Sequence, residues 1–467
     1  MSTTKIKSKD LRKINFKTDK AKSLAITIMS RQFKHVSKAE KLNILQDVLL
    51  HPEDYLKHEA LSQLAMEYVN APEENHGNKF QLLDLPGPFV VYGSQHIAQE
   101  AMRQMEMAMR LPVSVAGALM PDAHAGYGLP IGGVLATDNV VIPYGIGLDI
   151  GCRMSLTIYD IPAGFIKKDQ YQIKMALKAQ THFGIGKPTK QIADHEVLER
   201  KEFNELELLR QMHGKAAYQL GTSGSGNHFV EMGIVELFDS NALGVKAGEY
   251  VGLLAHSGSR GLGAAIAEQY TQIAMQQCQL PKGAKHFAWL DLDSAEGQEY
   301  WMAMNLAGDF AAASHDVIHQ KVAKALDIKP MLKIENHHNF AWKEIHNGQE
   351  VIVHRKGATP AAEGQAGIIP GSMVQPGYIV TGLGKADSLC SASHGAGRKM
   401  SRGRAKQSIT GSEMKKTLRQ AGVKLMGGGV DESPHVYKDL EGVMESQQTL
   451  VKKEGKFYPK IVRMDKN

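Results

Sequence analysis

The sequence predicts a mixed α and β (α+β) fold, with one large compact domain in which central β-sheets are flanked by helices. The 467 residues are 43% hydrophobic and 22% charged, which is ordinary for a globular protein. Short apolar runs alternate irregularly with helical segments, and this favours a mixed domain over a regular βαβ series. The 46 glycines cluster between residues 114 and 430, which indicates many turns. We expect residues 1–80 to form a helical extension and 81–467 the main domain.

Charge and cysteine content limit the possible partners and compartments. The chain has 55 Lys and Arg against 49 Asp and Glu, a net charge of +6, which is compatible with a polyanionic partner without establishing one. No stretch approaches the ~20 apolar residues of a membrane span, and the N-terminal residues lead into no apolar signal segment. The three cysteines fit no disulfide framework, so we expect a reducing, cytoplasmic setting and no membrane partner.

The N-terminal region is predicted to be mostly helical. Ser37 and Glu40 have the spacing of a capping box, an apolar-periodic segment follows them, and Pro52 is expected to end that helix. Lysines are dense in the first 22 residues. A solvated, frayed terminus explains them more simply than a nucleic-acid-binding arm does.

The main domain is predicted to mix strands and helices. Runs rich in β-branched and aliphatic residues predict strands at 89–92, 134–136, 140–142, 154–159, 229–232, 250–254, 333–335, 350–353 and 378–381. Helical patterns cover 95–111, most of 163–220, and 261–325. The tail from Asp439 is expected to be helical and then basic.

The stretch 148–153 carries the first candidate metal ligands. Asp149 and Cys152 stand three residues apart with Gly151 between them. A carboxylate and a thiolate at this spacing in a tight turn can face one ion. Taken alone, the pattern fits a small buried cysteine better than a ligand.

Four histidine-bearing segments downstream change that balance. Each histidine lies near small or amide residues, and most lie beside a predicted strand: Asn227-His228, His256-Ser257, His337-His338-Asn339 and Ser393-His394. Singly, each histidine fits a structural role. Together with Asp149 and Cys152 they indicate a metal centre in a cleft at strand ends. The mixed N, O and S ligand set suits Mn, Zn or Fe, and ligand type alone does not choose between them.

Glycine-rich turns beside arginines suggest anion binding. Gly395 to Arg398 and Arg402 combine backbone N–H groups with guanidinium groups, and Ser257 to Arg260 does the same. Gly371-Ser372 offers backbone and hydroxyl donors. Ordinary turns with surface arginines are an equally good explanation for each taken singly.

Long ordered motifs in residues 85–440 resemble one known family. Residues 121–134 read PDAHAGYGLPIGGV and residues 147–152 read GLDIGC. Further matches follow in the same order: GNHF at 226–229, HSGSRG at 256–261, HHN at 337–339, RKGA at 355–358, PGSM at 370–373 and SHGAGR at 393–398. The chain resembles the RtcB family of RNA-splicing ligases.

The resemblance implies an RNA ligase that depends on GTP and two Mn²⁺ ions. It would join RNA ending in a 2′,3′-cyclic phosphate or 3′-phosphate to RNA with a 5′-hydroxyl. A GMP–histidine intermediate and a guanylated RNA 3′-end would form on the way. Partners would be RNA with broken ends, such as tRNA, and GTP. The family also suggests an archease-like activating protein.

The resemblance also assigns roles to residues. His394 would be the nucleophile that takes GMP from GTP. The metal ligands would be Asp149, Cys152, His228, His256 and His338, with the Cys152 thiolate bridging the two ions. The guanylate pocket would be lined by Asn227, Glu231, Asn339, Ser372, Ala396, Gly397 and Tyr437, and Arg398 and Arg402 would meet phosphates or RNA.

The chain departs from the family pattern at several positions. Val374 follows Gly-Ser-Met where the family usually has glycine, and Gly377 falls where a serine commonly contacts the nucleotide. Arg153 replaces a small residue after the cysteine. The family usually ends in a Lys-Gly that touches guanine, whereas residues 462–467 here read VRMDKN.

Two alternatives remain open from the sequence. A metal-dependent phosphoesterase acting on RNA end phosphates without ligation would keep Asp149, Cys152 and the metal histidines but would not need His394. A non-catalytic RNA-binding or scaffold protein is a second alternative, and the full set of metal ligands argues against it.

Overall fold

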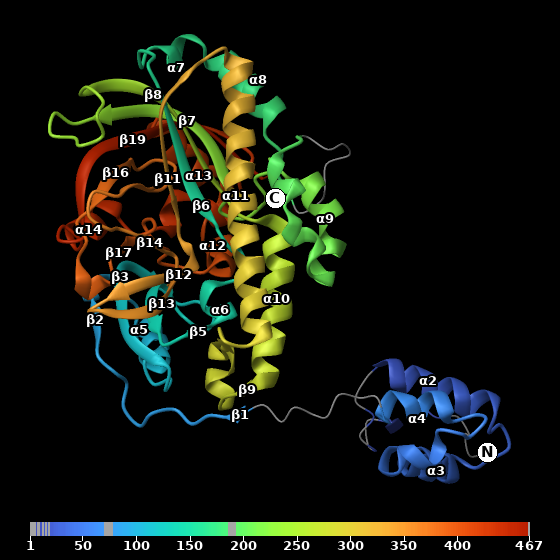
Figure 1. The fold of residues 1–467 in the computed structure, drawn as a ribbon. Coiled ribbons are helices and arrows are strands. Elements are labelled where there is room, and N and C mark those ends of the chain that lie inside the picture. The colour runs from blue at the N-terminus through green and yellow to red at the C-terminus, as the bar shows by residue number, and fades with distance from the viewer. Residues whose placement is uncertain are drawn as a thin grey trace. The chain divides into compact units, whose positions relative to one another are not determined.

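The computed structural model describes residues 6, 10–11, 14, 16, 19–69, 78–184 and 193–465. The chain divides into two compact units, Met1–His76 and Gly77–Asn467, each described here by itself (Figure 1).

The first unit is a small helical body. Its helices are α2 (Asp19–Arg31), α3 (Lys38–Leu50) and α4 (Ser62–Val69), with a 3₁₀ turn at Pro52–Tyr55. Leu45, Val48 and Leu64 are fully buried between them. The capping box is confirmed, because the Ser37 side chain accepts a hydrogen bond from the Glu40 backbone N–H and the Glu40 side chain accepts one from the Ser37 N–H.

The second unit is built on two mainly antiparallel sheets. The larger has the strand order β11-β6-β8-β7-β19-β16-β15, with β18 paired to β19, and the smaller has the order β12-β13-β4-β3-β2. The larger sheet comprises β6 (Arg153–Tyr159), β7 (Phe229–Leu237), β8 (Gly248–Ser257), β11 (Pro330–His337), β15 (Ala366–Ile369), β16 (Gly377–Gly382), β18 (Lys424–Met426) and β19 (Val451–Met464). The smaller comprises β2 (Phe89–Val91), β3 (Ser114–His124), β4 (Ile131–Thr137), β12 (Asn339–His346) and β13 (Gln349–Lys356).

Three short strand pairs and a set of helices complete the unit. The pairs are β1 (Asn78–Lys79) with β9 (Cys278–Gln279), β5 (Val140–Val141) with β10 (Leu290–Asp291), and β14 (Ala358–Pro360) with β17 (Ser391–Ser393). The helices are α5 (Gln99–Ala108), α6 (Pro143–Ile146), α7 (Phe165–Lys168), α8 (Gln170–Gln180), α9 (Glu207–Gln219), α10 (Arg260–Gln277), α11 (Ala295–Leu326), α12 (Arg402–Ser408), α13 (Gly411–Gln420) and α14 (Leu440–Glu445).

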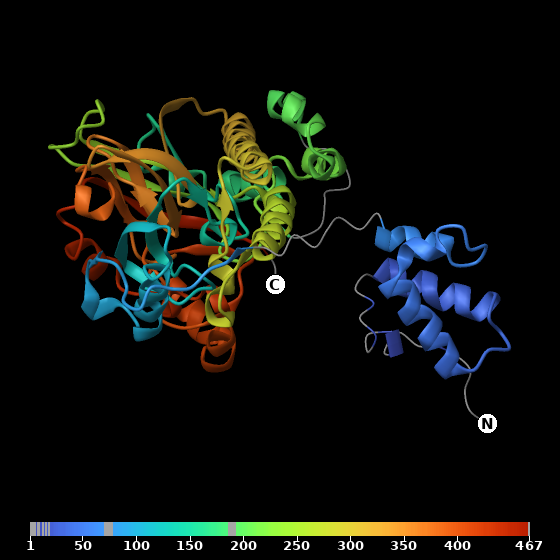
Figure 2. The same cartoon turned by 60° about the horizontal axis from the view of Figure 1, so that its bottom comes forward.

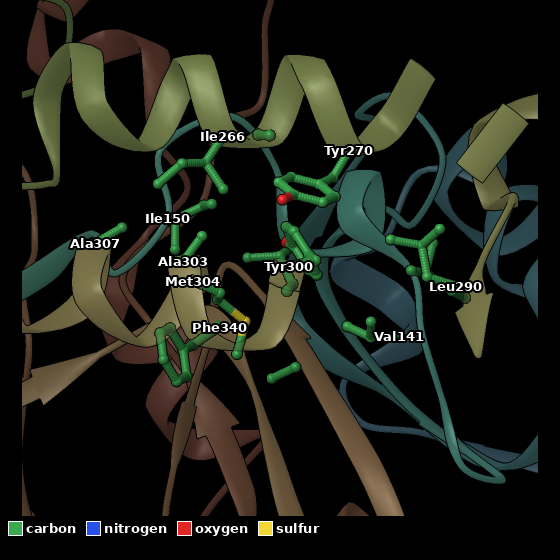
Figure 3. Packing of buried hydrophobic residues seen from close by; sticks show 14 of the residues in the cluster. Val141, Ile150, Ile266, Tyr270, Leu290, Tyr300, Ala303, Met304, Ala307 and Phe340 are labelled. Carbon is green, nitrogen blue, oxygen red and sulfur yellow. The ribbon is translucent and has the colours of Figure 1, made fainter. Parts of the chain in front are cut away.

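The long helices α10 and α11 lie together on one side of the sheets, as Figures 1 and 2 show from two directions. Their contact forms the centre of the largest core, where the rings of Tyr270 and Tyr300 lie 5.4 Å apart between centroids (Figure 3). Ile150, two residues before Cys152, is buried in the same core. The turn that carries the candidate ligands is therefore anchored against the largest hydrophobic core described.

The mixed α and β fold class is confirmed, and each predicted strand lies wholly or largely within an observed one. The helix predicted at 95–111 is shorter, since a 3₁₀ turn at Ser94–His96 precedes α5. The helical stretch predicted at 261–325 is interrupted by β9, a 3₁₀ turn and β10. Residues 185–192, within the predicted helical stretch 163–220, lie outside the described residues.

The tail begins with the predicted helix, α14, but the long strand in the basic stretch after it was not predicted. Residues Val451–Met464 form β19, which pairs with β7 on one side and β16 on the other. Its lysines, Gly455 and Pro459 hide the alternation of a strand, and register shifts accompany the glycine and the proline. Tertiary pairing overrides the local pattern here.

Candidate active site and metal centre

The turn before β6 places Asp149 and Cys152 side by side. The Cys152 N–H donates to the Asp149 carbonyl oxygen at 3.1 Å, which closes the turn. Gly151 has φ +70°, and a Cβ there would lie 2.8 Å from the Cα of Gly308 in α11. Only glycine fits this position, which explains the residue between the two candidate ligands.

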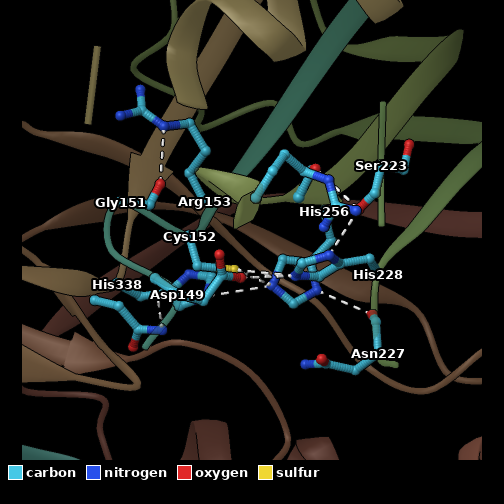
Figure 4. A network of polar contacts seen from close by, with 12 residues as sticks. Asp149, Gly151, Cys152, Arg153, Ser223, Asn227, His228, His256 and His338 are labelled. Carbon is cyan, nitrogen blue, oxygen red and sulfur yellow. Dashed lines mark hydrogen bonds and ion pairs between the residues drawn. The ribbon is translucent and has the colours of Figure 1, made fainter. Parts of the chain in front are cut away.

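Three histidines reach the same point from neighbouring strands. His228 immediately precedes β7, His256 lies near the end of β8, and His338 lies between β11 and β12. The Cys152 Sγ lies 3.2 Å from the His256 Nε2 and 3.5 Å from the His228 Nε2. The His256 and His338 Nε2 atoms are 3.2 Å apart (Figure 4). Cys152, His228 and His256 form a buried group that could hold a metal ion.

Backbone carbonyls fix the orientation of two of these rings. The His228 Nδ1 lies 2.7 Å from the Ser223 carbonyl oxygen, and the His256 Nδ1 lies 3.1 Å from the Asn227 carbonyl oxygen. Because a carbonyl only accepts, each Nδ1 carries a hydrogen, and Nε2 is the ring atom left available to bind an ion. This is the arrangement in which histidines bind metals.

The charges of the cluster also suit a cation. Burial lowers the pKa values of His256 and His338 well below the usual range, so both rings are neutral ligands at neutral pH. Burial and the charge of Asp149 raise the pKa of the Cys152 thiol. A bound divalent cation would reverse that effect and favour the thiolate. The buried imidazole, thiol and carboxylate groups that converge here therefore fit a metal ion.

Asp149 lies at the open side of the cluster. Its Oδ2 is 2.9 Å from the His228 Nε2, and its side chain is 32% exposed. Burial alone would raise the pKa of Asp149, but the neighbouring His228 outweighs it and the pKa is lowered. The carboxylate is thus charged and beside the other four predicted ligands.

His394 stands next to the metal cluster and is held by Asp122. The His394 and His338 ring centroids are 4.9 Å apart. The His394 Nδ1 lies 2.7 Å from the Asp122 Oδ2, which also accepts from the His394 backbone N–H at 3.2 Å. The carboxylate therefore accepts a hydrogen bond from the Nδ1–H, and the Nε2 lone pair stays available for attack.

Sequence reasoning missed Asp122. Its side chain is fully buried, and Gly397 has φ +73° with a Cβ position only 2.1 Å from the Asp122 carbonyl oxygen. Asp122 belongs to the PDAHAGYG motif, which contributed to the family resemblance but gave no role for this residue. Asp122 and His394 are 272 positions apart in the sequence, so no local spacing could link the two.

A cavity of about 280 Å³ opens beside His394 and the metal ligands. His256, His338 and His394 form part of its wall. Most residues predicted for the guanylate pocket or for phosphate contact line it, namely Asn227, Glu231, Ser372, Ala396, Gly397, Tyr437, Arg398 and Arg402. Lining residues that sequence reasoning did not assign include His124, Phe229, Met373, Glu432 and Met464.

Asn339 does not line this cavity. Its side-chain oxygen accepts from the Gly357 backbone N–H at 2.9 Å, and its amide nitrogen donates to the Asp149 carbonyl oxygen at 3.4 Å. The structure therefore places Asn339 behind the metal turn, where it braces the backbone that carries Asp149.

The carboxyl of Glu231 has an unusual environment. Burial raises the pKa of Glu231 to about 8, so the group is protonated at neutral pH. A neutral carboxyl both donates and accepts hydrogen bonds. It can therefore interact with the edge of a nucleobase.

The two arginines of the cavity are already paired. Arg402 donates to the Asp431 carboxylate at 2.9 Å and also contacts the Glu432 carboxylate. Arg398 donates to the Asp431 carbonyl oxygen at 2.8 Å and lies 3.6 Å from the Glu432 carboxylate. The Tyr437 hydroxyl donates a hydrogen bond to the Glu432 carboxylate. Burial is the main reason that the pKa of Tyr437 is raised, and the negative charge of Glu432 raises it further.

The departures from the family pattern have different structural settings. Arg153 is buried behind the metal turn, donating to Glu335 and to the Gly308 carbonyl oxygen at 2.8 Å each. Gly377 and Met464 line the cavity, and Val374 packs in the neighbouring apolar cluster. Lys466 lies outside the described residues.

Among the described helices, none is both long and apolar enough to cross a membrane.

Comparison with known proteins identifies the family. The profile described as "tRNA-splicing ligase RtcB" matches residues 104–206 and 201–465. The RNA-splicing ligase RtcB of Escherichia coli K12 is 33% identical over 365 residues, which cover 72% of this chain and 86% of that protein. The tRNA-splicing ligase RtcB of Nanoarchaeum equitans is 32% identical over 404 residues, covering 71% and 84%. The chain therefore belongs to the RtcB family of RNA-splicing ligases.

Proposed function

We propose that this protein joins RNA 2′,3′-cyclic phosphate or 3′-phosphate ends to 5′-hydroxyl ends, using GTP and two Mn²⁺ ions. The observation that carries the proposal is the pairing of His394 with Asp122 beside the converging ligands of the metal cluster. A phosphoesterase would use the metal cluster but has no need for a nucleophilic imidazole held in this way.

In the proposed first step, the His394 Nε2 attacks the α-phosphorus of GTP, a P–N bond forms and pyrophosphate leaves. The ring gains positive charge as the bond forms. The Asp122 carboxylate on Nδ1 stabilises that charge and keeps Nε2 aimed at the phosphorus. Oriented attack of this kind needs the ring fixed, and the second Asp122 contact, from the His394 backbone N–H, contributes to that.

The following steps consume the activated GMP. The RNA 3′-phosphate attacks the phosphorus of the histidine-bound GMP, which breaks the P–N bond and gives a guanylated RNA 3′-end. The 5′-hydroxyl of the second RNA then attacks the terminal RNA phosphate, and GMP leaves. A 2′,3′-cyclic phosphate must first be opened by water to give the 3′-phosphate.

The residues that would hold the metal ions are Asp149, Cys152, His228, His256 and His338. When bound, the ions supply charge neutralisation of the triphosphate and the RNA phosphate. Ligand type alone suits several metals, and the choice of manganese rests on the family resemblance.

The cavity would hold the guanylate. Asn227, Glu231, Ser372, Ala396, Gly397 and Tyr437 form the proposed pocket, with Arg398 and Arg402 at its phosphate-binding side. Asn339 would not touch the nucleotide. It would instead hold the backbone of the turn that carries Asp149 in place.

The proposed setting is reducing and cytoplasmic, because Cys152 must stay a free thiol to bind metal. RNA with broken ends, such as cleaved tRNA, is the proposed substrate. An archease-like activator is a further proposed partner, on the strength of the family alone.

The test is incubation of the full chain with GTP labelled at the α-phosphate and Mn²⁺. A covalent, acid-labile GMP adduct that is lost in His394→Ala is expected. Opening of a cyclic phosphate without any adduct would instead support a phosphoesterase. The His35→Ala variant, in the first unit, is a control that should retain the adduct.

A further inference from the structure

Arg463 differs from the arginines that line the cavity. It lies in β19 between Val462 and Met464, both of which line the cavity, so strand alternation directs Arg463 to the opposite face of the sheet. Its side chain is half-buried, and burial lowers the pKa of Arg463. Within residues 78–184 and 193–465 no carboxylate or carbonyl pairs with its guanidinium group, whereas Arg398 and Arg402 are both paired. A partly dehydrated cation of this kind favours an anionic partner from outside the protein.

An aromatic ring and a second cation lie beside Arg463. The guanidinium carbon is 5.7 Å from the centroid of the Phe183 ring. Burial lowers the pKa of His182, and the positive charges of Lys321 and Arg463 lower it further, so both cations are close to that ring. We call His182, Phe183, Lys321 and Arg463 the Phe183 patch.

Backbone hydrogen bonds join the Phe183 patch to the metal centre. Ser223, whose carbonyl oxygen orients His228, donates its N–H to the His182 carbonyl oxygen at 2.8 Å. Gly184 donates to the Gly224 carbonyl oxygen at 2.8 Å and accepts from Arg260 at 3.0 Å. The charge of Arg260 acts in turn on Asp149, at the open side of the metal cluster. The patch therefore lies one loop away from the metal ligands.

Further cations extend the patch along α7 and α8. Residues 165–183 contain the lysines 167, 168, 174 and 178 and one carboxylate, Asp169. Helix α8 lies beside α11, which carries Lys321, and contacts β19 (Figure 1). The carboxylate of Asp465, two residues after Arg463, acts on Arg260. The segment 165–183 that leads to the patch is therefore mainly basic, and Asp465 is a carboxylate close to it.

We propose that the Phe183 patch binds the RNA strand leading away from the broken end. Arg463 and Lys321 contact backbone phosphates, and a base stacks on Phe183 or on the Arg463 guanidinium plane. Cations interleaved with a flat aromatic ring are the arrangement that binds single-stranded RNA with little regard to sequence. The inference rests on the proposed function, because it supplies the RNA end that the metal centre and His394 would use.

The test is RNA binding by the full chain carrying Arg463→Gln and Lys321→Gln. Fluorescence anisotropy with a single-stranded RNA ending in a 3′-phosphate should show binding several-fold weaker than wild type at low salt. The slope of log affinity against log salt should fall by roughly 0.7 for each RNA phosphate that the variant no longer neutralises. Arg103→Gln, which changes an arginine on α5, should alter neither quantity.

Formation of the GMP adduct in the absence of RNA separates RNA binding from damage to the neighbouring cavity. We expect the adduct at wild-type rate in the double variant. Unchanged RNA affinity, or equal losses of RNA affinity and adduct formation, would contradict the proposal that the Phe183 patch binds RNA. A wild-type protein that binds RNA through the patch but forms no adduct would instead overturn the proposed function alone.

Phe183→Leu tests stacking separately from charge. Leucine keeps an apolar side chain in the surrounding cluster but removes the ring face. RNA affinity should fall at least about fivefold with the salt slope unchanged, because stacking releases no counterions. An affinity equal to wild type would contradict the role assigned to the ring.

Discussion

Two walls of the same cavity differ in how their polar groups are satisfied. At the strand-end wall, His256 and His338 line the cavity and Cys152 and His228 lie behind them, with neighbouring ligand atoms 3.2–3.5 Å apart. On the wall formed by α12 and the 3₁₀ turn Val430–Glu432, Arg398 and Arg402 are already bonded to Asp431 and Glu432. The first wall gathers ligand atoms that suit a cation, whereas the arginines of the second already have acidic partners, and of their buried nitrogens only the Arg398 Nη1 lacks a hydrogen bond among the described residues. Buried ligand atoms that converge on one point are therefore a better sign of a metal site than charge alone.

The largest expected effect comes from removing the thiolate of the first wall. Cys152→Ala should weaken manganese binding by more than about 100-fold and abolish the GMP adduct, because no other sulfur belongs to the cluster among the described residues. Metal content after dialysis checks this prediction. Cys278→Ala, which removes a buried thiol elsewhere in the core, is the matched control. Two tightly retained ions in Cys152→Ala would contradict the assignment.

Asp122→Asn should be the next most damaging change. The asparagine amide is neutral, so it no longer offers a charged acceptor to the His394 Nδ1–H. The His394 ring is then no longer held in one tautomer. The rate of adduct formation should fall by roughly 10²–10⁴-fold while manganese binding persists. Single-turnover kinetics with labelled GTP measure the rate. A rate within about twofold of wild type would show that Asp122 does not orient His394 for attack and has only a structural role.

Glu231 gives a pH test of the pocket. Burial raises the pKa of Glu231 to about 8 in the folded protein, from 4.5 in the unfolded chain. Between these pH values only the unfolded chain releases the proton. The free energy of unfolding of the wild type therefore falls as pH rises from about 4.5 to 8. The loss of folding free energy is on the order of 5 kcal/mol. Glu231→Gln does not titrate, so its melting temperature relative to wild type should rise between about pH 5 and pH 8. A difference independent of pH would mean that Glu231 is ionised in the folded protein.

The smallest effect is expected on the paired wall. Arg402 is 42% exposed on its side chain, so solvent screening reduces the value of its pairing with Asp431 to about 1 kcal/mol. A double-mutant cycle with Arg402→Gln and Asp431→Asn should give a coupling free energy of that order. Chemical denaturation measures it. A coupling near zero would indicate that Arg402 is free to leave Asp431 for a phosphate.

How far the sequence predicts this molecule depends on whether the signal is local. The turn at Asp149 and Cys152 and most of the strands beside the histidines were predictable, because glycine positions and apolar alternation are local features. The pairing of Asp122 with His394 was not, since it joins distant segments. β19 was also hidden, because its lysines, glycine and proline obscure the strand pattern that β7 and β16 impose on it. The Phe183 patch draws on three separate segments and was missed for the same reason.

The most direct test of the central claim is an anomalous difference map from crystals grown with Mn²⁺. We expect manganese peaks bonded to the Cys152 Sγ and to the Nε2 atoms of His228, His256 and His338, beside the cavity that His394 lines. Manganese bound elsewhere, with the thiol and the three imidazoles still contacting only one another, would contradict it.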